Sequence, residues 1–296
     1  MHKHHHTHHV NKAFIIAIVL TIIYIIAEVM SSFIANSMSL LADALHNLGD
    51  ALGLFLAALA NWLLTFPPKK RYSYGFKRTT IIAALLNACI LIATSSVIAV
   101  EAIYKLLHLS VVNEPIVMLI GILGIIINGG SALLFIRDAH HDLNIKGAFL
   151  HLLADALILV GVVLSAIIIY YTKWYWVDPV VGLIIILIVL YGTWGLLRDS
   201  VNMMLDAIPH HIDQTAVKNY LLNYPGVKTV HDLHIWGLST RETALTVHLI
   251  MPETILTDHD YKKINIILHE KFNIQHATIQ VETGKQNHPC KRSTVC

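Results

Sequence analysis

Residues 179–197 read PVVGLIIILIVLYGTWGLL, an apolar run that contains no charged side chain. A helix needs about 20 such residues to cross the roughly 30 Å hydrocarbon core of a bilayer. The whole chain has the same character, because 55% of its 296 residues are hydrophobic, only 14% are charged and the mean hydropathy is +0.62. Since a soluble domain has about 25% charged residues, this composition excludes a disordered chain and an ordinary soluble enzyme.

Six such stretches predict six membrane-spanning helices within residues 13–203. They cover residues 13–35, 40–66, 79–107, 115–136, 147–172 and 178–198. Polar residues return after this region, and the pattern over 204–284 predicts helices and strands in the order αββαβ. That order is typical of a small ferredoxin-like domain. We therefore expect an α-helical membrane protein with six transmembrane helices plus a C-terminal cytosolic α+β ferredoxin-like domain.

Basic residues in the short loops predict the orientation of the chain in its membrane lipid. Nine Lys or Arg residues lie on one side, whereas the other side has only Lys105 and Lys173. Because cytoplasmic loops carry the excess of basic residues, we expect a multi-pass protein of a bacterial inner membrane with both termini in the cytoplasm. The net charge of +2 indicates no nucleic-acid partner.

Ionisable side chains inside two of the stretches mark a candidate metal site, because each costs a few kcal/mol within a membrane. His46 and Asp50 lie four residues apart, and His151 and Asp155 repeat this spacing. Each pair therefore shares one helix face. Two imidazoles and two carboxylates form a four-coordinate set suited to tetrahedral Zn²⁺. The alternative is that each pair is a hydrogen-bonded couple that stabilises helix packing, but the repeated spacing favours the metal site.

Three functions are compatible with a membrane-embedded zinc site. In a zinc/proton antiporter, zinc displaces protons because only neutral imidazole binds the metal. A membrane-embedded zinc-dependent hydrolase would keep an open coordination position for water, whereas four ligands close the shell here. A non-transporting metal sensor would need an output module, and the sequence contains no kinase or cyclase. We therefore expect a transporter without enzymatic activity.

The strings SLLADALHNLGD at 39–50 and HLLAD at 151–155 resemble the cation diffusion facilitator family, in its zinc-exporting branch. The resemblance covers nearly the whole chain and includes DSV at 199–201, VHDLHIW at 230–236 and HATIQVE at 276–282. It implies a homodimer that exports divalent metal ions, mainly zinc, in exchange for protons. The chemistry of the two imidazoles and two carboxylates also tolerates cadmium.

The resemblance also implies a regulatory zinc ion in the cytosolic domain. His231, His248 and Glu282 match positions that hold zinc in this domain. Gln280 stands where some bacterial members have a further histidine, so we expect one ion there and not two.

Further candidate ligands lie toward the two ends of the chain. A second cytosolic site would use imidazoles and thiols, namely His234, His276, His288, Cys290 and Cys296. The alternative is that the tail, residues 285–296, is loose and carries reduced thiols. The head, residues 1–12, has six histidines among its first nine residues. It is either an expression tag or a flexible cytosolic tract that gathers metal.

Overall fold

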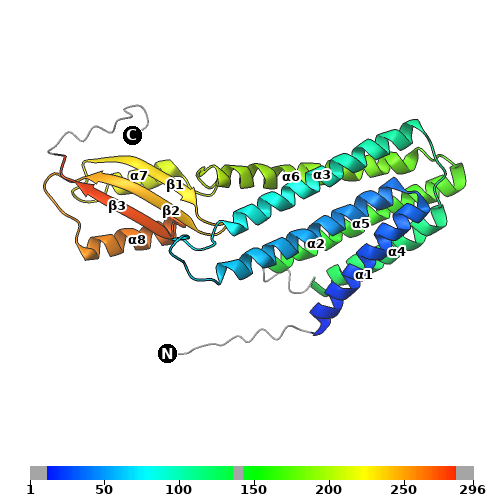
Figure 1. The fold of residues 1–296 in the computed structure, drawn as a ribbon, viewed down its shortest axis with the longest axis horizontal. Helices are drawn as coiled ribbons and strands as arrows, with labels where there is room; N and C mark the ends of the chain where they lie inside the picture. The colour runs from blue at the N-terminus through cyan, green and yellow to red at the C-terminus, as the bar shows by residue number, and fades with distance from the viewer. Residues whose placement is uncertain (1–11, 136–142, 285–296) are drawn as a thin grey trace. The chain divides into compact units, whose positions relative to one another are not determined.

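The computed structural model describes residues 12–135 and 143–284. Within those residues, six long helices precede a small mixed α and β region (Figure 1). The long helices are α1 (Lys12–Ala35), α2 (Met38–Leu64), α3 (Thr79–Leu107), α4 (Glu114–Phe135), α5 (Leu143–Thr172) and α6 (Val177–Met204). In the described part of the chain, α2 to α6 are long and apolar enough to cross a membrane, and α1 adds the shorter apolar segment Thr21–Ala35.

The chain divides into two compact units. The first comprises Met1–Leu54 and Asn87–Trp194, and the second comprises Phe55–Leu86 and Gly195–Cys296. The dividing points fall inside α2, α3 and α6. The second unit therefore contains one end of each of these helices as well as the small α and β region.

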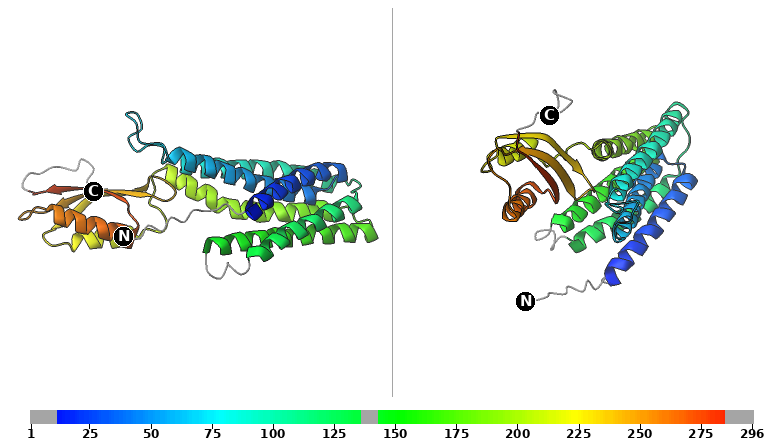
Figure 2. Two further views of the ribbon diagram at one scale, coloured as in Figure 1. Left: turned by 90° about the horizontal axis from the view of Figure 1, so that it is seen from below. Right: turned by 60° about the vertical axis from the view of Figure 1, so that its left-hand side comes forward.

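Close helix packing characterises the first unit. The helices α4 and α5 lie side by side in Figure 1 and in Figure 2. Gly121 of α4 permits this approach, because a Cβ atom there would lie 2.6 Å from Val163 of α5, closer than real Cβ contacts. Large apolar side chains such as Phe33, Val97 and Leu164 remain exposed on the outside of the helices. These exposed side chains suit helices that are surrounded by lipid.

A buried carboxylate forms hydrogen bonds with the beginning of α2. Asp178, at the beginning of α6, accepts hydrogen bonds from the hydroxyls of Ser37 and Ser39, both at 2.6 Å, and from the backbone N–H of Met38. The first N–H groups of a helix have no partner within the helix. Asp178 therefore caps α2 from a different helix, a contact that the sequence pattern does not predict.

The soluble region of the second unit has the predicted order of elements. They are α7 (Gln214–Leu222), β1 (Thr229–Gly237), β2 (Thr243–Ile250), α8 (Asp258–Phe272) and β3 (His276–Glu282). The central strand β2 pairs antiparallel with β1 and parallel with β3, and α8 forms the crossover that a parallel pair requires. Leu245, Val247 and Leu249 of β2 share a core with Leu221 of α7 and Leu268 of α8. The side chains of the alternate residues of each strand lie on the opposite face of the sheet, away from this core. The predicted fold class is confirmed.

Candidate metal sites

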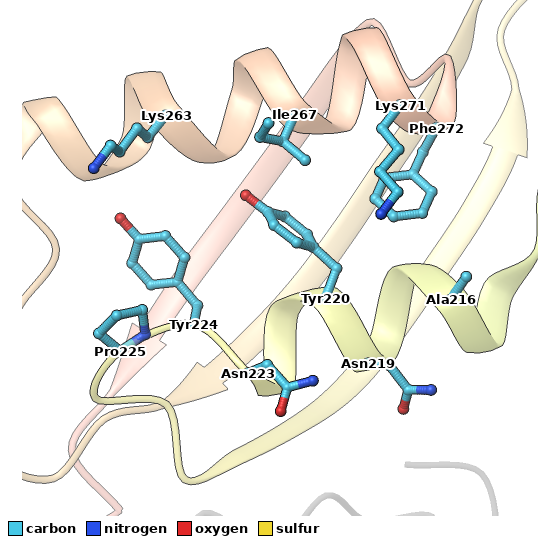
Figure 3. A pocket seen from close by; sticks show the side chains of 10 residues that line it. All are labelled: Ala216, Asn219, Tyr220, Asn223, Tyr224, Pro225, Lys263, Ile267, Lys271 and Phe272. Carbon is cyan, nitrogen blue, oxygen red and sulfur yellow. The ribbon is translucent and has the colours of Figure 1, made fainter.

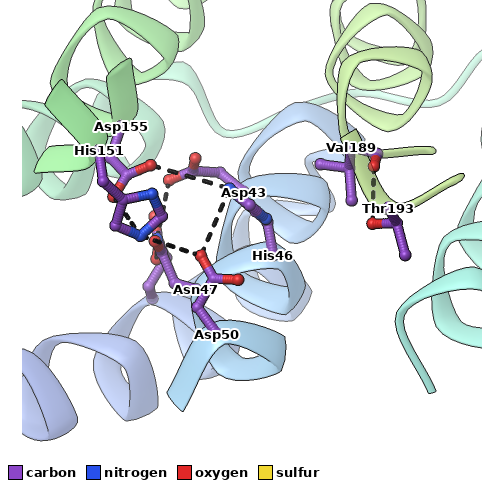
Figure 4. Close-up of polar contacts among 9 residues, drawn as sticks. Asp43, His46, Asn47, Asp50, His151, Asp155, Val189 and Thr193 are labelled. Carbon is purple, nitrogen blue, oxygen red and sulfur yellow. Dashed lines mark hydrogen bonds and ion pairs between the residues drawn. The ribbon is translucent and has the colours of Figure 1, made fainter. Parts of the chain in front are cut away.

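The four predicted ligands of the membrane region come together between α2 and α5 (Figure 4). His46 Nε2 lies 3.7 Å from Asp50 Oδ2 and 3.8 Å from Asp155 Oδ1. His151 Nε2 lies 3.2 Å from Asp50 Oδ2 and 3.6 Å from Asp155 Oδ2. The two imidazole rings are 6.3 Å apart at an angle of 77°. These residues, called the quartet below, thus form a closed ring of nitrogen and oxygen atoms.

The nitrogen-to-oxygen distances of the quartet are close to those of a tetrahedral zinc shell. With Zn–N and Zn–O distances of about 2.0–2.2 Å, neighbouring ligand atoms lie roughly 3.4 Å apart, close to the distances of 3.2 to 3.8 Å in the quartet. Asp155 is 6% exposed and His151 is 52% exposed, so the ring is open on one side. Asp50 Oδ2 is buried and receives no hydrogen bond. A bound cation would remove the cost of leaving this oxygen without a hydrogen bond.

The second cluster lies on the sheet face opposite the core. In the register of the sheet, His248 of β2 is opposite His231 of β1 and Gln280 of β3. Glu282 approaches both imidazoles, with Oε2 3.3 Å from His231 Nε2 and Oε1 3.0 Å from His248 Nδ1. One ligand atom from each of His231, His248 and Glu282 can be chosen so that all lie within 4.8 Å of one another. The structure therefore brings these three predicted residues together, and we call them with Asp232 the cytosolic cluster.

Asp232 was missed by the sequence analysis. Its Oδ1 lies 3.0 Å from His234 Nε2, and its Oδ2 lies 3.6 Å from His248 Nε2. Strand alternation would place Asp232 and His231 on opposite faces. A β-bulge shifts the register between His231 and His234, and Asp232 has a φ of +51°. The bulge re-aims its side chain, and no spacing in the sequence signals it.

The members of the second predicted cytosolic set have separate surroundings. His234 contacts Asp232, whereas the ring of His276 lies edge-on to Tyr74 at 5.6 Å. Outside the described residues lie the other members of the set, His288, Cys290 and Cys296, together with the histidines of the head. The possible second site therefore stays a prediction.

A groove of about 670 Å³ lies between α7 and α8 (Figure 3). Its lining includes Tyr220, Tyr224, Lys263 and Lys271, and none of its lining residues belongs to a predicted metal site. Burial, together with the hydrogen bond that the Tyr224 hydroxyl donates to Asp260 at 2.7 Å, raises the pKa of Tyr224 to about 12. Neutral phenols and charged ammonium groups are not the ligands of divalent metals. This groove is therefore not a candidate metal site.

Family models match almost the entire described chain. Residues 14–205 match the cation efflux transmembrane domain, and residues 209–284 match the cytoplasmic domain of cation efflux proteins. Together the matches contain the quartet and the cytosolic cluster.

Individual relatives match over most of their own length. The chain is 35% identical to the cation efflux system protein CzcD of Alcaligenes sp. (strain CT14), covering 99% of this chain and 92% of the relative. It is 35% identical to the zinc transporter ZitB of Escherichia coli (strain K12), covering 88% and 83%. It is 32% identical to the cadmium, cobalt and zinc/H(+)-K(+) antiporter of Bacillus subtilis (strain 168), covering 96% and 93%. Among solved structures, the metal-bound C-terminal domain of the CzcD transporter is 38% identical over 24% of this chain and 99% of that chain, with a TM-score of 0.21.

Proposed function

This chain belongs to the cation efflux family, and on that premise we propose that it exports zinc, and also cadmium, from the cytoplasm in exchange for protons. The family match agrees with the resemblance seen in residues 39–50 and 151–155. It identifies a multi-pass membrane transporter and not an enzyme. Neither a zinc-dependent hydrolase nor a non-transporting sensor is favoured. Relatives whose names specify zinc, and in one case cadmium, cobalt and protons, support the choice of substrates.

One observation carries the proposal for the transport site. The His–Asp pairs of α2 and α5 place the two imidazole nitrogens at 3.2 to 3.8 Å from carboxylate oxygens of Asp50 and Asp155, close to the nitrogen-to-oxygen edges of a zinc tetrahedron. Two carboxylates balance the charge of a divalent ion, which lowers the cost of holding it in a membrane. We therefore assign the quartet as the site that zinc occupies during transport.

Proton exchange follows from the chemistry of imidazole. A protonated His46 or His151 cannot bind zinc, so protons and metal compete for the same side chains. Alternate opening of the quartet to the two sides of the membrane would let zinc leave outward and protons return inward. An inward proton gradient thereby drives zinc out of the cytoplasm.

The cytosolic cluster is proposed to bind a regulatory zinc ion in a homodimer. His231, His248 and Glu282 provide the ligands, and their distances of 3.0 and 3.3 Å fit one metal shell. Gln280 donates a hydrogen bond to Glu282 Oε1 at 2.9 Å and so holds that carboxylate in place. An ion that binds only one form of the dimer stabilises that form in proportion to its free concentration.

The proposed exchange is tested by reconstituting the purified full chain into liposomes. Zinc and proton indicators are followed after a pH gradient is imposed in either direction. We expect zinc to move against the direction of proton flow and to stop when the gradient is dissipated. Zinc flux that ignores the gradient would contradict proton exchange.

A further inference from the structure

Two carboxyl groups near the quartet have no part in the functions above. Glu28 of α1 and Asp43 of α2 are both 0% exposed. Among the side chains that the structure describes, no Lys, Arg or His forms an ion pair with either of them. Asp43 precedes His46 by three residues and lies on the same side of α2. The pair is therefore buried within about one helical turn of the metal ligands.

Neutral donors surround this pair. Tyr24 donates its hydroxyl to Glu28 Oε1 at 2.8 Å. The amide of Asn47 donates to Glu28 Oε2 at 3.2 Å and to Asp43 Oδ2 at 3.3 Å, and the second of these contacts is drawn in Figure 4. Because one amide nitrogen donates to both, the two carboxyl groups are close neighbours. The remaining buried oxygen, Asp43 Oδ1, has no hydrogen-bond partner.

A shared proton accounts for this arrangement. Two adjacent carboxylates without a cation would carry the cost of two buried charges and their mutual repulsion. Adjacent carboxyl groups commonly avoid this cost by holding one proton between them. Such a proton also supplies the donor that Asp43 Oδ1 lacks.

The surroundings couple this proton to the quartet. Asp155 of α5, a member of the quartet, lies 3.8 Å from His46 Nε2, and His46 is about one helical turn from Asp43. From α4, Gly124 packs against the Tyr24 hydroxyl so closely that a Cβ atom there would lie 2.1 Å from it. Among the described residues, the ionisable side chains near the pair are Tyr24, His46 and Asp155. Zinc in the quartet adds two positive charges to this region and so favours the doubly ionised pair.

We propose that Glu28 and Asp43 form a proton-binding site separate from the metal ligands, which holds one proton while the quartet is empty and releases it when zinc binds. The carboxylic acid of the pair loses its proton to water on the side to which the quartet is open, leaving two carboxylates. This inference rests on the proposed exchange of zinc for protons, and it adds a carrier for one of those protons.

Calorimetric zinc titrations of the full-length protein test this inference. Titrations in buffers of different ionisation enthalpy give the number of protons released per protomer. Glu28→Gln keeps the shape of the side chain but has no proton to release, so we expect the release to fall by about one proton with the same number of zinc ions bound. Asp43→Asn should have the same effect, which provides a second variant if the first does not fold. The control is Glu101→Gln, on an exposed carboxyl of α3, which should release as many protons as the wild type.

The outcomes separate the proton site from the exchange itself. Unchanged proton release in folded Glu28→Gln and Asp43→Asn overturns the proton site. Loss of a bound zinc ion in these variants also overturns it, because the pair would then be a metal ligand. If the wild-type protein moves zinc in liposomes without proton counterflow, the proposed function is wrong. If the wild type exchanges protons while the variants release the full number, only the proton site is wrong.

Discussion

The quartet and the cytosolic cluster use the same kinds of side chain but are assembled in different ways. In the quartet, the turn of an α-helix brings His46 to Asp50 and His151 to Asp155, so only two helices need to meet. In the cytosolic cluster, each of three strands contributes ligands, and a β-bulge adds Asp232. A site on helices can therefore be recognised from the spacing of its residues in the sequence. A site across a sheet depends on the register between strands, which the sequence spacing does not give.

The two sites also differ in whether their carboxylate oxygens have hydrogen-bond partners when no metal is bound. In the cytosolic cluster, Glu282 is paired with His231, His248 and Gln280. In the quartet, Asp50 Oδ2 is buried without a hydrogen bond. A buried oxygen without a hydrogen bond is costly, and a cation bound in the quartet would contact this oxygen directly. This difference fits the proposed roles of the quartet in transport and of the cytosolic cluster in regulation.

The largest expected effect comes from removing a ligand of the quartet. Asp155→Ala should lower zinc flux in liposomes to background, because three ligands cannot complete the shell. Folding and dimerisation, followed by size-exclusion chromatography, should be retained. His259→Ala on the surface helix α8 is the matched control and should transport normally. Wild-type flux through Asp155→Ala would contradict the assignment.

Replacing an imidazole of the quartet with a carboxylate should change which metal ions this site prefers. His46→Asp makes the quartet an oxygen-rich site, which suits Mn²⁺ better than the original set. We expect the ratio of zinc to manganese flux to fall by about tenfold, equivalent to about 1.4 kcal/mol. Competition fluxes measure this ratio. An unchanged preference for zinc would indicate that selectivity lies outside the quartet.

Removing the cytosolic ligands should affect regulation and not the maximal rate. In a His231→Ala, His248→Ala double variant, the zinc-dependent change in distance between labelled cytosolic domains should disappear, because no regulatory ion stabilises the closed dimer. Zinc titrations of flux and of label distance measure both properties. Loss of maximal flux, or persistence of the distance change, would contradict the separate roles proposed for the quartet and the cytosolic cluster.

Deleting residues 2–9 should have a smaller effect, visible only at low zinc. A histidine-rich tract can raise the local metal concentration but does not supply ligands to the quartet. We expect slower transport at low zinc and an unchanged maximal rate, measured by initial rates over a range of zinc concentrations. A reduced maximal rate would show that the head takes part in transport itself.

The smallest effect concerns the fold that supports the cytosolic cluster. Hydrogen bonds from Thr257 hold the pKa of Asp260 at about 2, below its ordinary value near 3.9. The ionised Asp260 therefore stabilises α8 above about pH 4, and this contribution disappears as the pH falls toward 2. Thr257→Ala should reduce stability by about 1 kcal/mol at neutral pH and weaken this acid dependence. Hydrogen exchange of the α8 amides measures both, and an unaltered pH profile would contradict the role of this capping box.

Much of the fold can be predicted from the sequence because the signals for helices and strands are local. The third apolar stretch, 79–107, coincides with α3, but α6 continues to Met204, past the predicted end at 198. That extension is polar, so hydropathy does not detect it. The cap that Asp178 provides for α2 joins distant residues, and neither spacing nor hydropathy reveals such a contact.

The residues of the candidate sites also differ in whether the sequence could predict them. The quartet was predictable because four-residue spacing is a helical signal. His231, His248 and Glu282 were predicted only through family resemblance, since nothing in their spacing places them together. Asp232 and the pairing of Glu28 with Asp43 depend on a bulge and on contact between two helices. Such three-dimensional contacts are available only from the structure.

The most direct test of the quartet as the transport site is to locate zinc by its anomalous X-ray scattering in crystals of the zinc-loaded full chain. This assignment of the quartet predicts a zinc ion at about 2.0–2.2 Å from nitrogens of His46 and His151 and from oxygens of Asp50 and Asp155. It would be contradicted by crystals grown at zinc concentrations that support transport in which the cytosolic cluster holds zinc and the quartet holds none.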